Sequence, residues 1–222
     1  MNRSRLVPAI GLLALALSPV LATACVPSSQ LCSTPAIIRL VGSAGGVADA
    51  QAGSFTVVVR DIANNPQMGA SVIVDLSGCP DATVCPDQLD PNEVVNLTAK
   101  TVRKFVDANG QATFTIVGGS TGNGNAAVVS NGAVIKGLVN GAVRIFGNGT
   151  LLGSPNFATY DLDGSGGLGP TDLSVFLTDI ASGTPFARSD FSGDGVLNAT
   201  DMCLWLTTFA AGRSVQSCPV HP

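Results

Sequence analysis

A twelve-residue acidic pattern occurs twice near the C-terminus, and it restricts the fold of this chain more than any other feature. The first copy, D-L-D-G-S-G-G-L-G-P-T-D, covers residues 161–172 and is called loop one. The second copy, D-F-S-G-D-G-V-L-N-A-T-D, covers residues 190–201 and is called loop two. Each has oxygen-bearing side chains at positions 1, 3, 5 and 12 and a glycine at position 6. A pair of Asp- and Gly-rich turns is the alternative, but turn chemistry explains neither the fixed spacing nor its recurrence.

The spacing is that of an EF-hand-type calcium loop. Calcium takes about six to eight oxygen ligands, so several carboxylates must converge on one point, and glycine allows the sharp turn around the ion. We therefore expect two Ca²⁺ ions per chain. The expected ligands of loop one are Asp161, Asp163, Ser165, the carbonyl of Gly167 and Asp172, with Gly169 supplying only a water. Those of loop two are Asp190, Ser192, Asp194, the carbonyl of Val196, Asn198 directly or through water, and Asp201.

An apolar segment follows each loop, and its residues recur at spacings of three and four. This spacing predicts an amphipathic helix that starts at loop position 12 and ends at a glycine, Gly183 or Gly212. The apolar residues are Leu173, Val175, Phe176, Leu177 and Ile180 in the first copy and Met202, Leu204, Trp205, Leu206 and Phe209 in the second. No helix is expected before loop one, where Pro155 interrupts a short segment. The repeating unit is thus a loop followed by a helix, and Trp205 is expected in the core.

This loop–helix duplication resembles a type I dockerin domain, from about Phe157 to Gly212. The resemblance implies calcium binding and docking onto a cohesin-like protein through two surfaces related by pseudo-twofold symmetry. The positions that contact the partner in this family correspond to Pro170, Thr171, Leu177, Thr178, Ala199, Thr200, Leu206 and Thr207. Family helices often carry Lys or Arg near Thr178 and Thr207, and here one serine replaces a loop ligand in each copy. Calcium binding is expected to survive these departures, whereas they leave recognition of a conventional cohesin open.

Residues 1–24 have the features of a secretory signal peptide. Arg3 and Arg5 precede an apolar stretch at 10–17, and Ala22 and Ala24 form a small-residue cleavage site. No apolar segment reaches the roughly 20 residues that a membrane-spanning helix needs. We expect a protein secreted to the outside of a bacterium or held on its surface. Acylation of Cys25, as in a bacterial lipoprotein, is the alternative and would provide a lipid anchor.

Export places the six cysteines in an oxidising compartment, where they are expected to form disulfides. Cys79 with Cys85 would close a short loop, and Cys25 with Cys32 and Cys203 with Cys218 are the other neighbouring choices. Six cysteines allow about 15 connectivities, so the pairing stays open.

Residues 25–153 are expected to form an all-β immunoglobulin-like sandwich. Short runs rich in Val, Ile and Thr alternate with turn residues, and Phe55, Val57 and Val59 should share one buried face. The predicted strands are 36–41, 54–60, 71–76, 94–106, 112–117, 126–129, 133–138 and 142–146, with a hairpin turn at 107–110. The run F-T-V-V-V-R-D-I-A-N-N-P-Q-M-G-A-S-V-I-V-D-L and the later D-A-N-G-Q-A-T-F-T-I resemble bacterial immunoglobulin-like modules of the invasin and intimin type.

These features divide the chain into a signal peptide (1–24), a β-sandwich (25–153), a dockerin-like calcium module (154–213) and a tail (214–222). A net charge of −4 without a basic patch argues against nucleic-acid binding. The sandwich has no histidine and only one glutamate, Glu93, so general acid–base chemistry has few candidates. We expect a secreted, non-catalytic calcium-binding protein that docks onto another protein. An enzyme or accessory subunit of polysaccharide degradation, and a surface adhesin or carbohydrate-binding module, are the alternatives.

Overall fold

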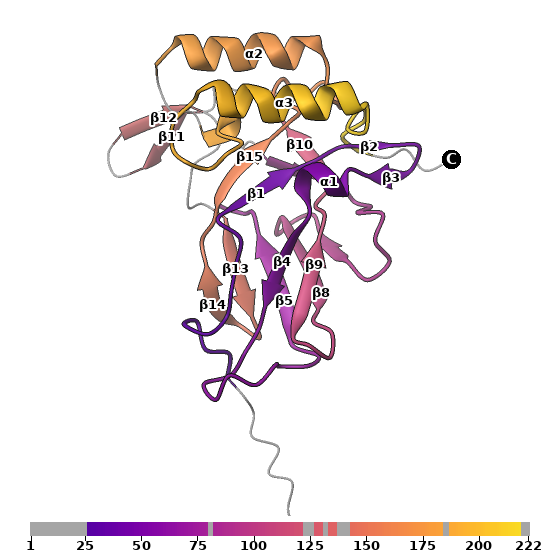
Figure 1. Ribbon diagram of the computed structural model, residues 1–222, viewed down its shortest axis with the longest axis vertical. Helices are drawn as coiled ribbons and strands as arrows, with labels where there is room; N and C mark the ends of the chain where they lie inside the picture. Colours follow the sequence, from indigo (N-terminus) through magenta and orange to yellow (C-terminus); the bar gives the residue numbers. More distant parts are fainter. Residues whose placement is uncertain are drawn as a thin grey trace, which may run out of the picture.

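The computed structural model describes residues 26–79, 82–121, 127–130, 133–136, 143–183 and 187–218 (Figure 1). The expected signal peptide, Cys25 with its acylation and its bond to Cys32, and the last four residues lie outside this part of the chain. Strands in several sheets make up most of the regular secondary structure of the described residues, and two long helices come last. No described helix has the length and apolar character needed to cross a membrane.

A five-stranded antiparallel sheet forms one layer. Its strand order is β14-β13-β5-β8-β7. The strands are β5 (Ser71–Asp75), β7 (Val94–Asn96), β8 (Thr101–Phe105), β13 (Arg144–Gly147) and β14 (Thr150–Gly153).

Shorter pairings face this sheet. Strand β4 (Phe55–Val58) pairs with β9 (Gln111–Phe114), and β6 (Ala82–Val84) pairs with β10 (Gly118–Ser120). Strand β1 (Ile37–Leu40) runs parallel to β15 (Asn156–Thr159). The other elements are β2 (Ser43–Ala44), β3 (Val47–Ala48), β11 (Ala127–Ser130), β12 (Ala133–Lys136) and the single-turn helix α1 (Ala50–Gly53).

The core lies between these layers and follows the alternation predicted from the sequence. Phe55, Val57 and Val59 are buried, while Thr56 between them is exposed. They belong to one cluster with Val72 of β5 and Phe114 of β9, whose ring stacks on Phe55 at 5.5 Å between centroids. One buried face on each layer is the arrangement of a β-sandwich, so the mostly-β expectation is confirmed at that level.

Two sequence predictions about strands are wrong. Residues 94–106 form two strands, because residues 97–100 turn the chain back and Lys100 has a φ of 49°. Residues 107–110 do form a turn, with Gly110 donating to Asp107 at 3.0 Å, but it is not a hairpin. The strands beside it, β8 and β9, pair with different partners, so this turn connects the two layers.

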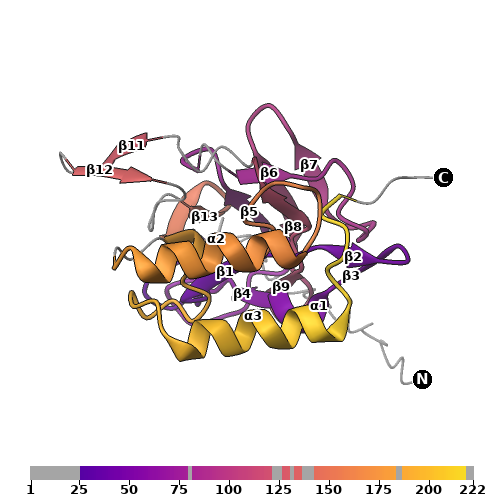
Figure 2. The same cartoon turned by 90° about the horizontal axis from the view of Figure 1, so that it is seen from above.

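Helices α2 (Pro170–Ala181) and α3 (Ala199–Ala211), with the 3₁₀ turn η1 (Ala187–Ser189) between them, lie across one end of the β-strands (Figures 1 and 2). Each begins two residues earlier than predicted, because the aspartate at loop position 12 lies within the first turn and caps it. The helices stop before Gly183 and Gly212, both with positive φ, as expected.

The helices pack into a second cluster that the strands also enter. Phe176 and Trp205 are buried there with Phe191, Tyr160 and Val41. The Tyr160 and Phe191 rings stack at 4.8 Å. Trp205, 1 % exposed, is a core residue as predicted. The apolar stripe of each helix thus faces a shared core that includes strand residues, rather than the other helix alone.

Candidate metal centres

Each acidic loop brings three carboxylates together. Asp161, Asp163 and Asp172 each offer a ligand oxygen, and these oxygens lie within 4.8 Å of one another. Asp190, Asp194 and Asp201 form the same kind of group in loop two. Loop one starts one residue after the end of β15, and each loop continues into a helix, so the elements on both sides hold the group in place. The six carboxylates thus lie in two groups as expected, and their role as metal ligands stays a prediction.

The aspartate at position 12 holds each loop closed. Asp172 accepts hydrogen bonds from the backbone N–H groups of Leu162, Asp163 and Gly169 at 2.6–2.9 Å. In loop two, Asp201 accepts from Ser192 at 2.8 Å and Asn198 at 3.0 Å. The glycines at position 6, Gly166 and Gly195, have φ of 97° and 83°, a conformation that few other residues adopt.

The aspartate at position 1 is buried in both loops, but its two oxygens differ in loop one. Asp161 Oδ2 accepts hydrogen bonds from the Gly166 amide and the Ser217 hydroxyl. Its Oδ1 is buried and accepts no hydrogen bond of normal geometry, although the nearby Gly164 amide acts on this carboxyl group and opposes the rise in its pKa that burial causes. Asp161 is only 4 % exposed, so water does not reach this oxygen. A cation at the centre of the loop would supply the missing interaction, since an unpaired buried carboxylate oxygen is costly.

Crowding of carboxylates perturbs their protonation in loop one. Burial raises the pKa of Asp161, and burial together with the charges of Asp163 and Asp161 raises the pKa of Asp172 to about 6. Burial acts in the same direction on Asp163, but hydrogen bonds from Thr171 and Ser165 outweigh it and lower that pKa. Hard oxygen donors with net negative charge are the ligands that Ca²⁺ prefers.

The other predicted ligands make local hydrogen bonds. Ser165 Oγ lies 3.5 Å from the carbonyl oxygen of Gly167, and Ser192 Oγ donates to Asp190 at 3.2 Å. Asn198 caps α3 by accepting from Thr200 at 2.7 Å and donates to the carbonyl of Val196 at 3.3 Å. Their role as ligands stays a prediction.

All eight positions expected to contact a partner are exposed: Pro170, Thr171, Leu177, Thr178, Ala199, Thr200, Leu206 and Thr207. Leu177 and Leu206 are 45 % and 43 % exposed, which is high for leucine on a helix. Thr178 and Thr207 each donate to the carbonyl four residues earlier. The two helices therefore present matching surfaces, although contact with a partner stays a prediction.

An ion pair between the two copies was not predicted. Arg188 of η1 donates through Nε and Nη2 to both oxygens of the buried Asp179 in α2, at 2.8 and 2.7 Å. Thr208 occupies the equivalent position in α3, so the repeat is not symmetric here. The signal available in the sequence was a lone aspartate on the apolar face of the first helix.

The disulfide pairing expected from neighbouring cysteines is wrong. Cys85 is bonded to Cys218, 133 residues away, with a Cα–Cα distance of 5.3 Å. This bond excludes both Cys79–Cys85 and Cys203–Cys218. Cys79 is buried and Cys203 is exposed on α3. The bond connects the β-strands to the C-terminal tail.

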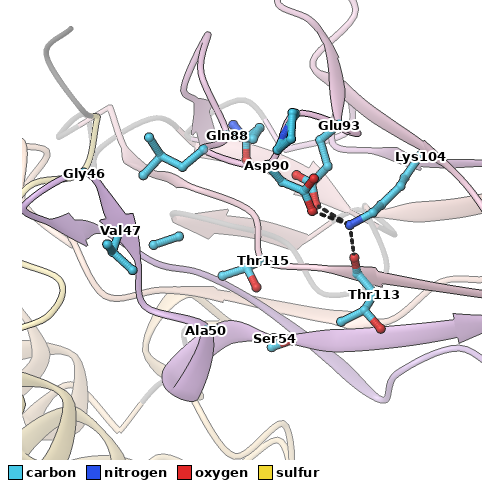
Figure 3. A pocket seen from close by; sticks show the side chains of 13 residues that line it. Gly46, Val47, Ala50, Ser54, Gln88, Asp90, Glu93, Lys104, Thr113 and Thr115 are labelled. Atoms are coloured by element: carbon cyan, nitrogen blue, oxygen red, sulfur yellow. Dashed lines mark hydrogen bonds and ion pairs between the residues drawn. The ribbon is translucent and has the colours of Figure 1, made fainter.

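A cleft of about 540 Å³ lies beside β8 and β9, away from the loops (Figure 3). Lys104 forms an ion pair with Asp90 at 2.5 Å and lies 3.7 Å from Glu93. Burial raises the pKa of Glu93 to about 7. However, the Glu93 side chain is only 1 % exposed, and both of its oxygens are buried. A substrate cannot reach these two oxygens in this conformation. The ion pairs of Lys104 connect β8 to the segment that precedes β7.

Comparison of the chain with protein-family models, curated proteins and solved structures finds no match.

Proposed function

We propose that this chain is a secreted, non-catalytic calcium-binding protein in which an immunoglobulin-like β-sandwich supports a dockerin-like pair of calcium loops. The proposal rests most on the surroundings of Asp161. Its Oδ1 is buried and accepts no hydrogen bond of normal geometry, and its carboxylate belongs to a group of three that converge. The same residues fit an EF-hand-type ligand set. Bound calcium would neutralise the repulsion among these carboxylates and thereby stabilise each loop.

The two exposed helix faces support a docking role. Leu177 with Thr178 and Leu206 with Thr207 occupy equivalent positions in the two copies and are open to solvent. A protein partner of the cohesin type could engage either copy, in two orientations related by about 180°, as the resemblance implies. The alternatives of a polysaccharide-degrading enzyme and of a carbohydrate-binding adhesin lack an equally specific site among the described residues.

Calcium titration by calorimetry tests the first half of the proposal. We expect two ions per chain. Asp172→Asn and Asp201→Asn should each remove one ion, because each variant loses a carboxylate ligand. The asparagine keeps an oxygen that can accept the loop's backbone hydrogen bonds, so the loop itself should stay folded. The matched control is Asp107→Asn, which makes the same change in an exposed turn far from the loops in sequence. Absence of calcium uptake by the unaltered protein would sink the proposal.

A further inference from the structure

Residues 213–218 cross the surface of loop one, and we call this segment the C-terminal strap. The amide of Leu168 donates to the carbonyl of Ser214 at 2.9 Å, and the amide of Ser217 donates to the carbonyl of Gly166 at 2.7 Å. A Cβ atom on Gly167 would lie 2.0 Å from the carbonyl oxygen of Val215. Loop one and the strap are therefore in direct backbone contact, which requires glycine at position 167.

The β-strands hold the other side of the strap. Ser43 and Gln216 exchange two backbone hydrogen bonds, at 2.6 and 3.1 Å. The buried Asp49 accepts from Arg213 at 3.1 Å and from Ser214 Oγ at 3.0 Å. The Cys85–Cys218 disulfide then attaches the end of the strap covalently next to β6. The position of the strap over loop one is thus set by residues more than 100 positions earlier in the chain.

Within this segment, Ser217 contacts a predicted metal ligand. Its hydroxyl donates to Oδ2 of Asp161, and both side chains are at least 95 % buried. Gly119 packs so closely that an added Cβ would lie 2.6 Å from the same Oδ2 and 2.9 Å from Ser217 Oγ. The carboxylate is therefore held with Oδ2 toward Ser217, and Oδ1 is the oxygen left for an ion.

Loop two has no equivalent support among the described residues. Asp190 accepts hydrogen bonds from Gly193, Asp194, Gly195 and Ser192, which all belong to its own loop. The strands contact loop two through backbone carbonyls instead: Asn156 donates to Gly193, and Arg39 donates to Phe191. The sequence repeat thus contains two loops whose first ligands are oriented in different ways.

We propose that Ser217 is a positioning residue of calcium loop one, and that the Cys85–Cys218 disulfide sets the calcium affinity of this loop by holding the strap in place. This inference rests on the proposed calcium binding. Groups that hydrogen-bond a metal ligand orient it, and their loss typically weakens metal binding about 10–100-fold. Without the disulfide only the non-covalent contacts hold the strap, so Ser217 donates to Asp161 for a smaller fraction of the time. Loop two keeps its own donors and should not respond.

The experiment isolates each loop in the full-length protein. Asp201→Asn leaves loop one as the calcium site, and Asp172→Asn leaves loop two. In the Asp201→Asn protein, Ser217→Ala and the double change Cys85→Ser with Cys218→Ser should each weaken calcium binding about tenfold or more, measured by calorimetry. Combining them should have no larger effect than Ser217→Ala alone, because both act through the same contact. A general loss of stability would instead weaken calcium binding at both loops.

The Asp172→Asn protein is the control, and its calcium affinity should change less than about twofold with either substitution. Ser217→Ala keeps the disulfide and therefore tests the positioning role even where the cysteine variant does not fold. Equal affinities of loop one with and without Ser217 overturn the inference while leaving calcium binding intact. Absence of calcium binding in the unaltered protein overturns both.

Discussion

Glu93 and Asp90 contact the same lysine, yet their surroundings move their pKa values in opposite directions. Burial raises the pKa of Glu93 to about 7. Partial burial acts on Asp90 in the same direction, but the hydrogen bond and charge of Lys104 outweigh it and lower that pKa. The folded chain therefore keeps a proton on Glu93 over a pH range in which the unfolded chain has lost it.

This difference predicts a pH-dependent stability. The contribution of protonated Glu93 should be fully present below pH 4.5, its ordinary pKa, and should be lost as the pH rises to about 7. The free energy of unfolding should fall by about 2–3 kcal/mol over that range. Urea denaturation in saturating calcium measures this fall, and Glu93→Gln should reduce the slope of the free energy of unfolding against pH. Asp107→Asn is the control for the lost charge and should keep the slope of the unaltered protein. A slope that Glu93→Gln leaves unchanged would contradict the assignment to Glu93.

At the scale of elements, the two loop–helix units share a backbone design but differ in their attachments. Asp172 and Asp201 cap their helices in the same way. The first unit is additionally fixed by the Asp179–Arg188 ion pair and by the strap, whereas the second has Thr208 in place of Asp179. The surfaces that the two units expose to solvent are nevertheless alike. Leu177 and Thr178 in the first unit correspond to Leu206 and Thr207 in the second.

This likeness predicts redundant docking. Replacing Leu177 and Thr178 by arginine should weaken binding of a purified type I cohesin domain, or of a secreted partner captured in calcium, by about twofold, because one of two orientations is lost. Replacing Leu206 and Thr207 as well should reduce affinity at least about 100-fold. Surface plasmon resonance measures both. The helix positions give a cleaner test than Thr171, whose hydroxyl contacts the ligand Asp163.

Two controls accompany this test. Calcium stoichiometry should be unchanged in both variants, and Phe105→Arg, on an exposed strand position, should not affect docking. If the fourfold variant binds the same partner with unaltered affinity, the docking surface lies elsewhere.

At the scale of the whole molecule, many contacts cross the expected boundary at residue 153. β15 pairs with β1, the amide of Ser120 donates to the carbonyl of Asp161, and the disulfide connects residues 85 and 218. The second cluster also combines helix residues with Val41 and Ala158. Loop one is therefore built onto the end of the β-strands. The expected division of the chain at residue 153 stays a prediction, but these contacts argue against separate folding of the parts on its two sides.

These contacts predict that the chain unfolds in one transition that calcium shifts as a whole. Trp205 fluorescence follows the helices and the β-sheet component of the infrared amide I band follows the strands, and their thermal midpoints should coincide. Calcium at about 100 times its dissociation constant should add about 2.7 kcal/mol per site. Chelator should lower both midpoints together. If the strand signal keeps its midpoint in chelator while Trp205 changes, the two parts unfold independently.

The features that could be predicted are those encoded over short distances. Twelve consecutive residues determine which carboxylates can reach one point, and alternation along β4 determines which side chains are buried. The disulfide, the β1–β15 pairing and the contact of Ser217 with Asp161 could not be predicted in this way. Each joins residues far apart in the sequence, and six cysteines alone allow about 15 pairings. Only packing of the helices against the end of the strands decides which distant segments meet, and this packing makes two loops of the same ligand spacing unequal.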